Sequence, residues 1–470
     1  MQPFTQVCLA TYNNKSRNLP SLKVNSTGHT YIFLPGKPLD PNFTITVFPL
    51  PANMSWDMKL PPELLSDLME YLGSQYRGRA FLFQALLVNW LWFAAASRVL
   101  WRVPPVSALA KVREDERQKY ATHIRQLYFK GNEDRALHSI FRNLRFPQLR
   151  YIDIDHVLFE TEQFLPLGQY IQGQLKHFKF CGYRAVEDVV DLLTARCPNL
   201  ESVDLGFKNR WRPSSEYLIR FFDDKSLKSI CINHHMTESV DRKLVAYLSS
   251  YNSLEKLTLW TPLDTQRLNG AFNPNEYIHF PNLRYLDLQI NVSYIPQLVK
   301  SIQPTNNLIE LHLTAEGDSV NPLPHVCELK SLKVLCIHYL RPAQWPVIDI
   351  LALTGLPYLF ILRITSLGVL DTNLECPQLT DQTFAYVLQS KQFLRELVFE
   401  VRSNLTVEAI VCLGMYCRQL RVCQLSGLYD LRRFWLRDNG RKNRLKYIRS
   451  ILFPWLENLR LTRIVPAPKE

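Results

Sequence analysis

One short phrase, L-x-x-L-x-L with apolar substitutions, recurs through most of this 470-residue chain. It occurs thirteen times, from IRQLYF at Ile124 to LENLRL at Leu456. Successive phrases begin 25, 26, 25, 27, 27, 29, 25, 24, 27, 35, 26 and 36 residues apart. Chance matches would scatter these intervals. A fixed period of this length is typical of an array of stacked structural units.

The alternation within each phrase predicts a short strand, with its apolar residues on one face and its x residues on the other. Helical patterns separate the phrases. In AVEDVVDLLTARCPNL, for example, Val186, Val189, Val190, Leu193 and Cys197 recur at helical spacing. One strand–helix unit cannot bury its apolar face alone, whereas stacked units build a continuous core. We therefore predict an α/β solenoid of about thirteen strand–helix repeats over residues 123–465. The two long intervals indicate insertions after Leu359 and after Leu420.

Ten of the twelve intervals fall in the roughly 20–29 residue range of a leucine-rich repeat. The stretches LTDQTFAYVLQSKQFLRELVF and LTVEAIVCLGMYCRQLRVCQLSG resemble the cysteine-containing subtype of that family. The resemblance implies a horseshoe in which each cysteine is a small buried apolar residue. None of the ten cysteines forms a C-x-x-C motif. We expect reduced core thiols in an intracellular protein of the cytoplasm or nucleus, with no metal site and no cofactor.

A second feature precedes the array. Residues 80–97, AFLFQALLVNWLWFAAAS, carry no charge and reach the length of a membrane span, which needs roughly 17–25 apolar residues. Gln84 and Asn89 interrupt the apolar run, and arginines flank both of its ends. We therefore favour a helical unit that buries one apolar face on itself and offers another to a partner.

The segment containing this run has the opening L-P-x-E-L-L, then a break, the pair V-x-x-x-W and a final L-W. This order of motifs resembles the F-box, a small three-helix unit. In the opening, Leu64, Leu65, Leu68 and Leu72 are expected on one helix face. An F-box immediately before leucine-rich repeats is a known architecture. The residues expected to bind the adaptor, or to pack the unit's helices, are Leu60, Pro61, Glu63, Leu64, Leu65, Leu68, Val88, Trp92, Leu100 and Trp101.

The resemblance implies a non-catalytic role. An F-box binds a Skp-type adaptor, which tethers it to the cullin scaffold of an SCF-type ubiquitin ligase, and the repeats hold the protein substrate. The alternative interpretation is that these helices merely cap the solenoid. We predict a poorly ordered arm over residues 1–56, the F-box over 57–104, a linker helix over 105–122, and then the solenoid.

The x positions of the phrases are the expected substrate surface, because repeat arrays bind partners on their concave strand face. Aromatic residues dominate binding hot spots, which favours Trp260 and Tyr285. The predicted substrate-binding residues are Tyr128, Tyr151, His177, Lys179, Lys256, Trp260, Tyr285, Asp287, His312 and Arg363. Other x positions are Asp153, His338, Glu396 and Glu400.

The remaining hypothesis is a scaffold outside ubiquitin transfer that binds an anionic partner. The formal net charge is +12, and residues 431–449 hold eight Lys or Arg against one Asp. Interleaved basic and aromatic residues can bind nucleic acid or anionic lipid, but a solvated insertion is the simpler interpretation. Nucleic acid and membrane partners are therefore not expected. The absence of G-x-S-x-G, H-E-x-x-H and P-loop motifs argues against an enzyme.

Overall fold

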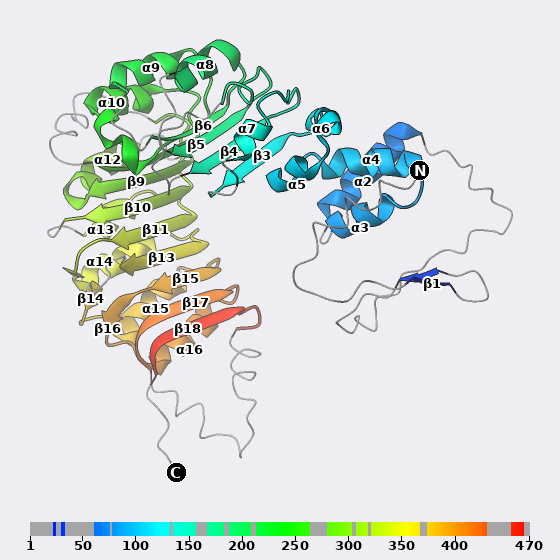
Figure 1. The fold of residues 1–470 in the computed structure, drawn as a ribbon. Helices are drawn as coiled ribbons and strands as arrows, with labels where there is room; N and C mark the ends of the chain where they lie inside the picture. The colour runs from blue at the N-terminus through cyan, green and yellow to red at the C-terminus, as the bar shows by residue number, and fades with distance from the viewer. Residues whose placement is uncertain are drawn as a thin grey trace. The chain divides into compact units, whose positions relative to one another are not determined.

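The protein's structure, a computed structural model, is shown in Figure 1. It describes residues 22–24, 30–32, 61–75, 78–131, 134, 136–156, 167–182, 188–207, 213–263, 280–302, 307–317, 321–366, 374–429 and 453–464. The chain divides into two compact units, residues 1–127 with 139–148 and residues 128–138 with 149–470. The basic segment 431–449 and most of the predicted arm lie outside the described residues.

A parallel sheet of thirteen strands organises the second unit, and its strands are neighbours in chain order. Its strands are β3 (Gln126–Lys130), β4 (Tyr151–His156), β5 (His177–Gly182), β6 (Ser202–Phe207), β7 (Ser229–Ile232), β8 (Lys256–Leu263), β9 (Tyr285–Asn291), β10 (Glu310–Glu316), β11 (Val334–Tyr339), β13 (Ile361–Ser366), β15 (Glu396–Phe399), β17 (Val422–Tyr429) and β18 (Asn458–Ile464). Each strand falls on one of the thirteen phrases. The predicted leucine-rich-repeat-like solenoid is therefore confirmed.

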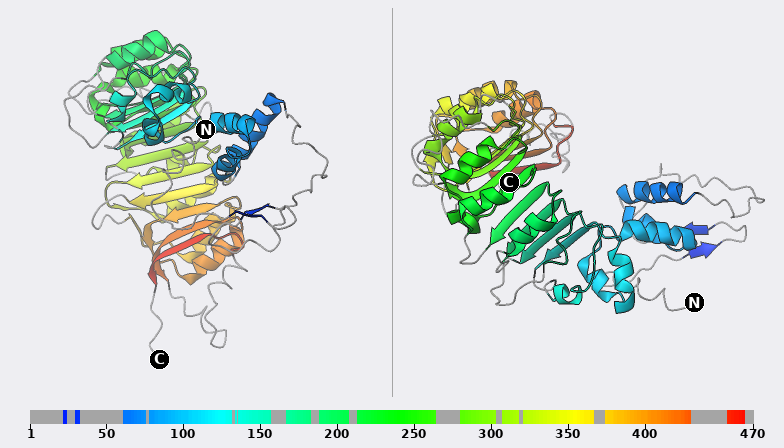
Figure 2. Two further views of the ribbon diagram at one scale, coloured as in Figure 1. Left: turned by 45° about the vertical axis from the view of Figure 1, so that its right-hand side comes forward. Right: turned by 90° about the horizontal axis from the view of Figure 1, so that it is seen from above.

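Helices return the chain between most strands and cover one face of the sheet (Figures 1 and 2). They are α7 (Leu137–Ile140), α8 (Asp188–Arg196), α9 (Ser215–Asp223), α10 (Arg242–Ser250), α12 (Ile295–Ile302), α13 (Leu323–Val326), α14 (Val347–Leu351), α15 (Asp381–Gln389) and α16 (Val407–Tyr416), with short turns η1 (His234–Ser239), η2 (Val292–Tyr294) and η3 (Ala352–Gly355). Helices pack about 8–10 Å apart, whereas strands lie about 4.8 Å apart. The repeats must therefore fan out on the helical side, which makes the strand face concave.

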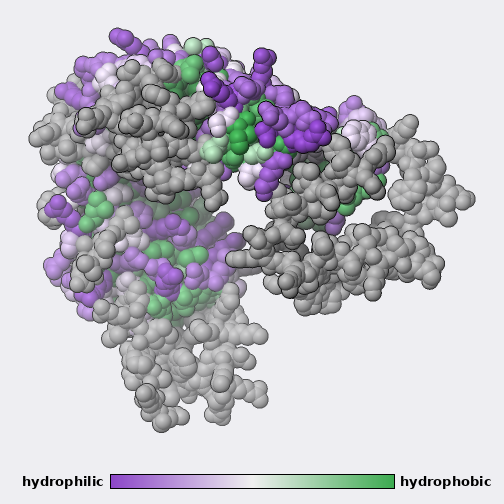
Figure 3. Space-filling view, viewed as in Figure 1, coloured by the Kyte–Doolittle hydropathy of each residue, from purple (hydrophilic) through white to green (hydrophobic). Residues whose placement is uncertain are grey.

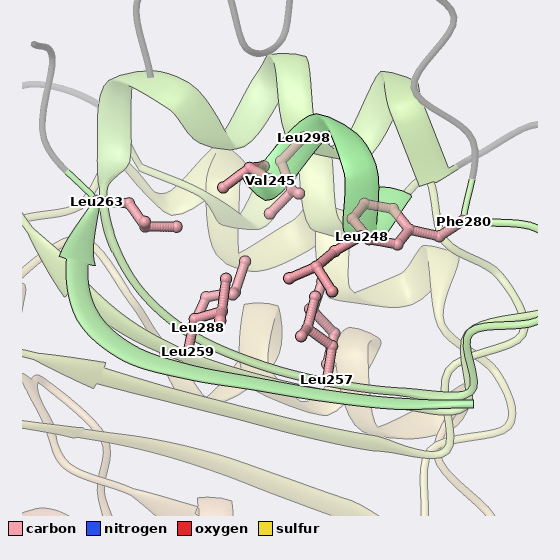
Figure 4. Close-up of a pocket in the computed structure, with 9 residues that line it drawn as sticks. Val245, Leu248, Leu257, Leu259, Leu263, Phe280, Leu288 and Leu298 are labelled. Atoms are coloured by element: carbon pink, nitrogen blue, oxygen red, sulfur yellow. The ribbon is translucent and has the colours of Figure 1, made fainter. Parts of the chain in front are cut away.

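The core lies between the sheet and the helices. Leu257 and Leu259 of β8 point toward Val245 of α10 and Leu298 of α12 around a small cavity lined only by apolar side chains (Figure 4). Every second strand residue points into this layer, so β9 and β10 alternate between buried and half-buried side chains. The other strand positions point away from the helices and form the concave face. We assign residues to this face because they alternate with the buried positions.

The cysteines behave as the sequence predicts. The nine described cysteines are all free thiols, and seven of them are buried. Cys197 and Cys417 follow α8 and α16 and are fully enclosed. Burial raises the pKa of the Cys197 thiol to about 11 and that of Cys417 to about 12. A thiol in this state is an inert apolar filler.

A second, smaller sheet was not predicted. Strands β12 (Ala343–Gln344), β14 (Leu374–Cys376) and β16 (Val401–Ser403) pair in parallel in that order. The interval of 35 residues after Leu359 contains β14. Strands of two or three residues leave no readable period in a sequence, so this sheet gave no signal.

The described residues of the first unit include the helices α2 (Pro62–Ser74), α3 (Gly78–Ala85), α4 (Trp90–Leu100), α5 (Val106–Lys111) and α6 (Glu114–Ala121). Strands β1 (Leu22–Val24) and β2 (Thr30–Ile32) form a short antiparallel pair. Pro61 is the N-cap of α2 and Pro62 is its first residue, and a helix start suits both because no backbone N–H is needed there. The single linker helix predicted over 105–122 is wrong: a break at Val112 and Arg113 divides this segment into α5 and α6.

The charge-free run is not one helix. The side chain of Asn89 accepts a hydrogen bond from the backbone N–H of Trp92 and begins α4 there, after a turn that ends α3. Such a cap satisfies an N–H that a new helix start would otherwise leave unpaired. No helix among the described residues has the length and apolar character to cross a membrane.

Candidate functional site

Two surfaces carry the residues that the sequence singled out, one in each unit. In the first unit, α2, α3 and α4 pack around Leu65, Met69, Leu82, Ala85 and Ala96, which are all buried. Leu68, Trp92 and Leu100 pack against this core. Arg102 also forms an ion pair with Glu70 on α2. These contacts make the three helices a small packed unit.

Large apolar side chains remain exposed on this unit. Leu87 is 76% exposed, Trp90 70% and Leu64 56%. The exposed set is Leu64, Tyr71, Phe81, Phe83, Leu87, Val88, Trp90 and Leu91, and we call it the apolar surface. Six of its eight members lie between residues 81 and 91, at the end of α3 and the start of α4. Burying one such side chain stabilises a complex by about 1.5–3 kcal/mol, so this surface is suited to a partner.

The sequence did not distinguish residues that pack the helices from residues that remain exposed to a partner. Burial in the structure distinguishes them. Leu65, Leu68, Trp92 and Leu100 pack the helices, and the Trp101 ring packs against that of Tyr120 with ring centroids 4.6 Å apart. The residues left exposed are Pro61, Glu63, Leu64 and Val88. Leu60 lies outside the described residues.

The expected common face for Leu64, Leu65, Leu68 and Leu72 is partly wrong. The buried stripe follows i, i+3, i+4 and i+7 from Leu65 and includes Met69 in place of Leu64. Leu64 precedes this stripe by one position, about 100° around the helix axis, and so points to solvent.

On the concave face, the first group of residues lies on β3 to β6. Tyr128, Tyr151 and His177 stand on successive strands, with ring centroids 5.1 and 5.9 Å apart. Two positions farther along β5 than His177, Lys179 Nζ lies 3.8 Å from Asp153 Oδ1 and 3.8 Å from Asp204 Oδ2. The register places Asp153, Lys179 and Asp204 side by side. We call these three residues the charged cluster.

The charged cluster is partly desolvated. Burial raises the pKa of Asp153 and that of Asp204 above the ordinary aspartate range. Burial alone would lower the pKa of Lys179, but the surrounding carboxylates outweigh it and the pKa is raised. Asp153 Oδ1 and Asp204 Oδ1 are buried and accept no hydrogen bond from the described residues. Lys130 also lowers the pKa of Asp153, and a hydrogen bond from the Cys231 thiol lowers that of Asp204, but burial outweighs both, so the carboxylates are compensated incompletely.

A second group lies on β8 to β10. Asp287 Oδ2 accepts hydrogen bonds from Trp260 Nε1 at 3.0 Å and from the Tyr285 hydroxyl at 3.4 Å. Lys256 Nζ lies 4.1 Å from the centroid of the Tyr285 ring, in cation–π contact. His312 on β10 completes the group, with its ring centroid 5.1 Å from that of Tyr285. We call Lys256, Trp260, Tyr285, Asp287 and His312 the aromatic cluster.

Burial gives this cluster fixed protonation states. Burial lowers the pKa of His312, so the imidazole is neutral at pH 7. Burial and the Asp287 carboxylate raise the pKa of Tyr285, so its hydroxyl remains a donor. Trp260 is 45% exposed although its indole N–H is held. A fixed, half-exposed indole loses little conformational entropy on binding, which is the property of a hot-spot side chain.

Farther along the array the concave face is occupied by internal pairs. Arg363 Nε lies 2.6 Å from Glu396 Oε1, and Gln424 donates to Glu400. His338 Nδ1 and Thr365 Oγ1 are 2.5 Å apart. These side chains are satisfied by one another, so Arg363 is less available to a partner than the sequence suggested.

The structure thus brings nine of the ten predicted substrate-binding residues into two groups, and Arg363 lies apart from both. Sequence reasoning missed most of the apolar surface. Its signal was present in the charge-free run, where Phe81, Phe83 and Leu91 exceed what one helix face can bury. Elsewhere, the described surface in Figure 3 mixes hydrophilic and hydrophobic residues. No three His, Cys, Asp or Glu side chains within the described ranges are placed to hold a metal ion.

Comparison with known proteins gives limited likeness. No protein-family model matches the sequence, and no curated protein matches it. An internalin, InlF, from Listeria monocytogenes aligns with 66% of this chain and 82% of its own length, at 13% identity and a TM-score of 0.36. Listeria monocytogenes InlP aligns with 57% of this chain and 65% of its own, at 12% identity and a TM-score of 0.25. The fold of the second unit therefore rests on its own strand order and register.

Proposed function

We propose that this chain is a substrate-receptor subunit of an SCF-type ubiquitin ligase. The α2–α4 unit binds a Skp-type adaptor, which connects it to the cullin scaffold, and the solenoid holds a protein substrate on its concave face. The observation that carries this proposal is the apolar surface. A unit that only capped the solenoid would have no use for eight large apolar side chains directed at water.

The chain contributes no chemistry in this proposal. Its role is to hold the substrate near a ubiquitin carrier, which raises the effective concentration of the reacting groups. The aromatic cluster supports the substrate-binding half of the proposal, because it presents a fixed indole beside charged groups. The alternative scaffold that binds an anion through residues 431–449 stays a hypothesis, since that segment lies outside the described residues.

Co-purification tests the adaptor contact directly. Tagged full-length chain is incubated with the host's Skp-type adaptor, beside a Leu64→Arg/Val88→Arg variant. Both side chains are more than half exposed, so the variant should keep the parent's melting temperature and lose the adaptor. Ile348→Arg is the matched control, because Ile348 is 65% exposed on α14 of the other unit.

Stoichiometric capture by the parent and the control, with loss in the double variant, would support the proposal. Equal capture by the double variant would place the adaptor contact elsewhere and remove the argument from the apolar surface. A parent that captures no adaptor would contradict the ligase role itself.

A further inference from the structure

We propose that the concave face between β4 and β9 binds an extended basic segment of the substrate protein, with one cation at the charged cluster and another at the aromatic cluster. This inference rests on the proposed function, because it assigns a chemical class to the substrate. It concerns a different surface from the adaptor contact. The two can therefore fail independently.

Charge complementarity is the first argument. Concave-face positions of the thirteen strands hold seven carboxylates and five cations, although the whole chain carries a net charge of +12. The carboxylates are Asp153, Asp155, Asp204, Asp287, Glu310, Glu316 and Glu396, and the cations are Lys130, Lys179, Lys256, Arg363 and Arg460. The face that a partner would enter is thus acidic on a basic molecule. Potentials of opposite sign guide partner selection, so the charge points to a basic partner.

The charged cluster is the first of the two proposed cation-binding sites, which we call seats. Asp153 is only 6% exposed, and its Oδ1 and that of Asp204 accept no hydrogen bond from the described residues. Lys179 stands 3.8 Å from each neighbour, beyond hydrogen-bond distance. Asp155 adds a third carboxylate on the same face. A guanidinium or ammonium brought by a partner would supply the missing compensation.

The aromatic cluster supplies the second seat. Its own Lys256 already lies over the Tyr285 ring, which shows that the ring accepts a cation. Trp260 offers the stronger cation–π surface, is 45% exposed, and is oriented by Asp287. An arginine stacked on Trp260 would meet the carboxylate that holds the indole. The Tyr128–Tyr151–His177 rings border the first seat in the same way.

The distance between the seats predicts the spacing of the two cations. Lys179 of β5 and Trp260 of β8 are separated by three strand steps, and Asp287 of β9 by four. At about 4.8 Å per step the span is roughly 14–19 Å, which an extended chain covers in about four to six residues. Two arginines about five positions apart would fill both seats.

A peptide assay tests the proposal on the full-length chain without adaptor. The probe is a fluorescein-labelled Gly/Ser decapeptide that carries two arginines five positions apart, followed by fluorescence anisotropy at low salt. We expect saturable binding, at least tenfold weaker in an Asp153→Asn/Asp287→Asn variant. Binding should also weaken at high salt and for a peptide with adjacent arginines.

Two controls define the outcome. Asp224→Asn, at the exposed C-terminal cap of α9, should leave the affinity unchanged. A decapeptide with glutamates in place of the arginines should not bind. Absence of saturable binding to the arginine peptide would overturn the proposal, and so would an equal affinity in the double variant.

A stability measurement excludes a purely structural role. Asparagine at position 153 removes an incompletely compensated charge while keeping the shape of the side chain. The Asp153→Asn melting temperature should therefore be no lower than the parent's. A lowered melting temperature with unchanged peptide affinity would identify Asp153 as a structural partner of Lys179 and refute the seat. Adaptor capture would remain a separate result in either case.

Discussion

Buried thiols should make the solenoid unfold at alkaline pH. Burial raises the pKa of Cys197 and Cys336 to about 11, and that of Cys327, Cys417 and Cys423 to about 12, from an ordinary value of 9.0. An unfolded thiol loses its proton above pH 9, whereas the folded thiol keeps it. The folded state therefore binds more protons above pH 9, and the free energy of unfolding falls as the pH rises toward 11.

The magnitude follows from the linkage relation. At pH 10, ionisation stabilises the unfolded chain by about 1.4 kcal/mol per thiol, so five thiols give about 7 kcal/mol. Lys391 acts in the opposite direction, because burial lowers its pKa to about 8. Between pH 8 and pH 10, deprotonation of Lys391 in the folded state stabilises that state by about 2 kcal/mol relative to the unfolded chain. The net loss of about 5 kcal/mol is comparable with the whole stability of an ordinary domain, about 5–15 kcal/mol.

Urea unfolding followed by circular dichroism at pH 8 and pH 10, with reductant present, measures this loss. Cys423→Ala lowers stability at both pH values through lost packing, but its fall between pH 8 and pH 10 should be about 1.4 kcal/mol smaller than the parent's. Cys412 is only partly buried, so Cys412→Ala should change that fall less. An equal fall in the parent and Cys423→Ala would refute the reasoning.

Three further predictions concern single packing sites. Met69→Ala, at a fully buried position between α2 and its neighbours, should cost about 2–5 kcal/mol in thermal unfolding of the first unit, whereas exposed Leu87→Ala should stay within about 0.5 kcal/mol; similar losses would contradict the assignment of core and surface. Lys391→Met leaves the Leu353 and Leu356 carbonyls, now 2.6 and 2.8 Å from Nζ, buried and unpaired, but below the lowered pKa of Lys391 it also removes a buried ammonium, so its cost in urea should be larger at pH 10 than at pH 7. An equal cost at the two pH values would mean that the buried ammonium does not destabilise the folded state. Gly206→Ala should cost about 1–3 kcal/mol, since the added Cβ would lie 2.9 Å from Cys181 Sγ. An unchanged urea midpoint would show that β5 shifts enough to accommodate the added methyl group.

Repetition made the solenoid predictable. Each phrase alternates apolar and other residues over a strand, and stacking leaves one plausible place for the apolar set, so β9 and β10 match the expected pattern of burial. The same alternation placed Trp260, Tyr285 and Asp287 on one face before any contact was known. Their hydrogen bonds could not be predicted, because both depend on side-chain rotamers, and the one from Trp260 to Asp287 joins residues 27 positions apart in the chain.

The first unit was less predictable because it does not repeat. Composition identified an apolar segment, but the helix break depended on one side chain, that of Asn89. The roles of Leu64 and Leu65 differ only by the 100° step between adjacent helix positions. Which of two neighbouring leucines is buried depends on where Met69 and Leu82 lie, and that is set by tertiary packing.

The small β12–β14–β16 sheet has a consequence for local opening. Between β11 and β15, successive repeats are joined by two ladders of backbone hydrogen bonds, one in each sheet. Elsewhere in the described array, one ladder and the helix packing join each repeat to the next. In a nearly one-dimensional stack, separation begins at the ends and moves inward repeat by repeat. Amide hydrogens of β13 and β15 should therefore exchange with solvent more slowly than those of β4 and β5, and this doubly paired segment should be the last part of the sheet to open.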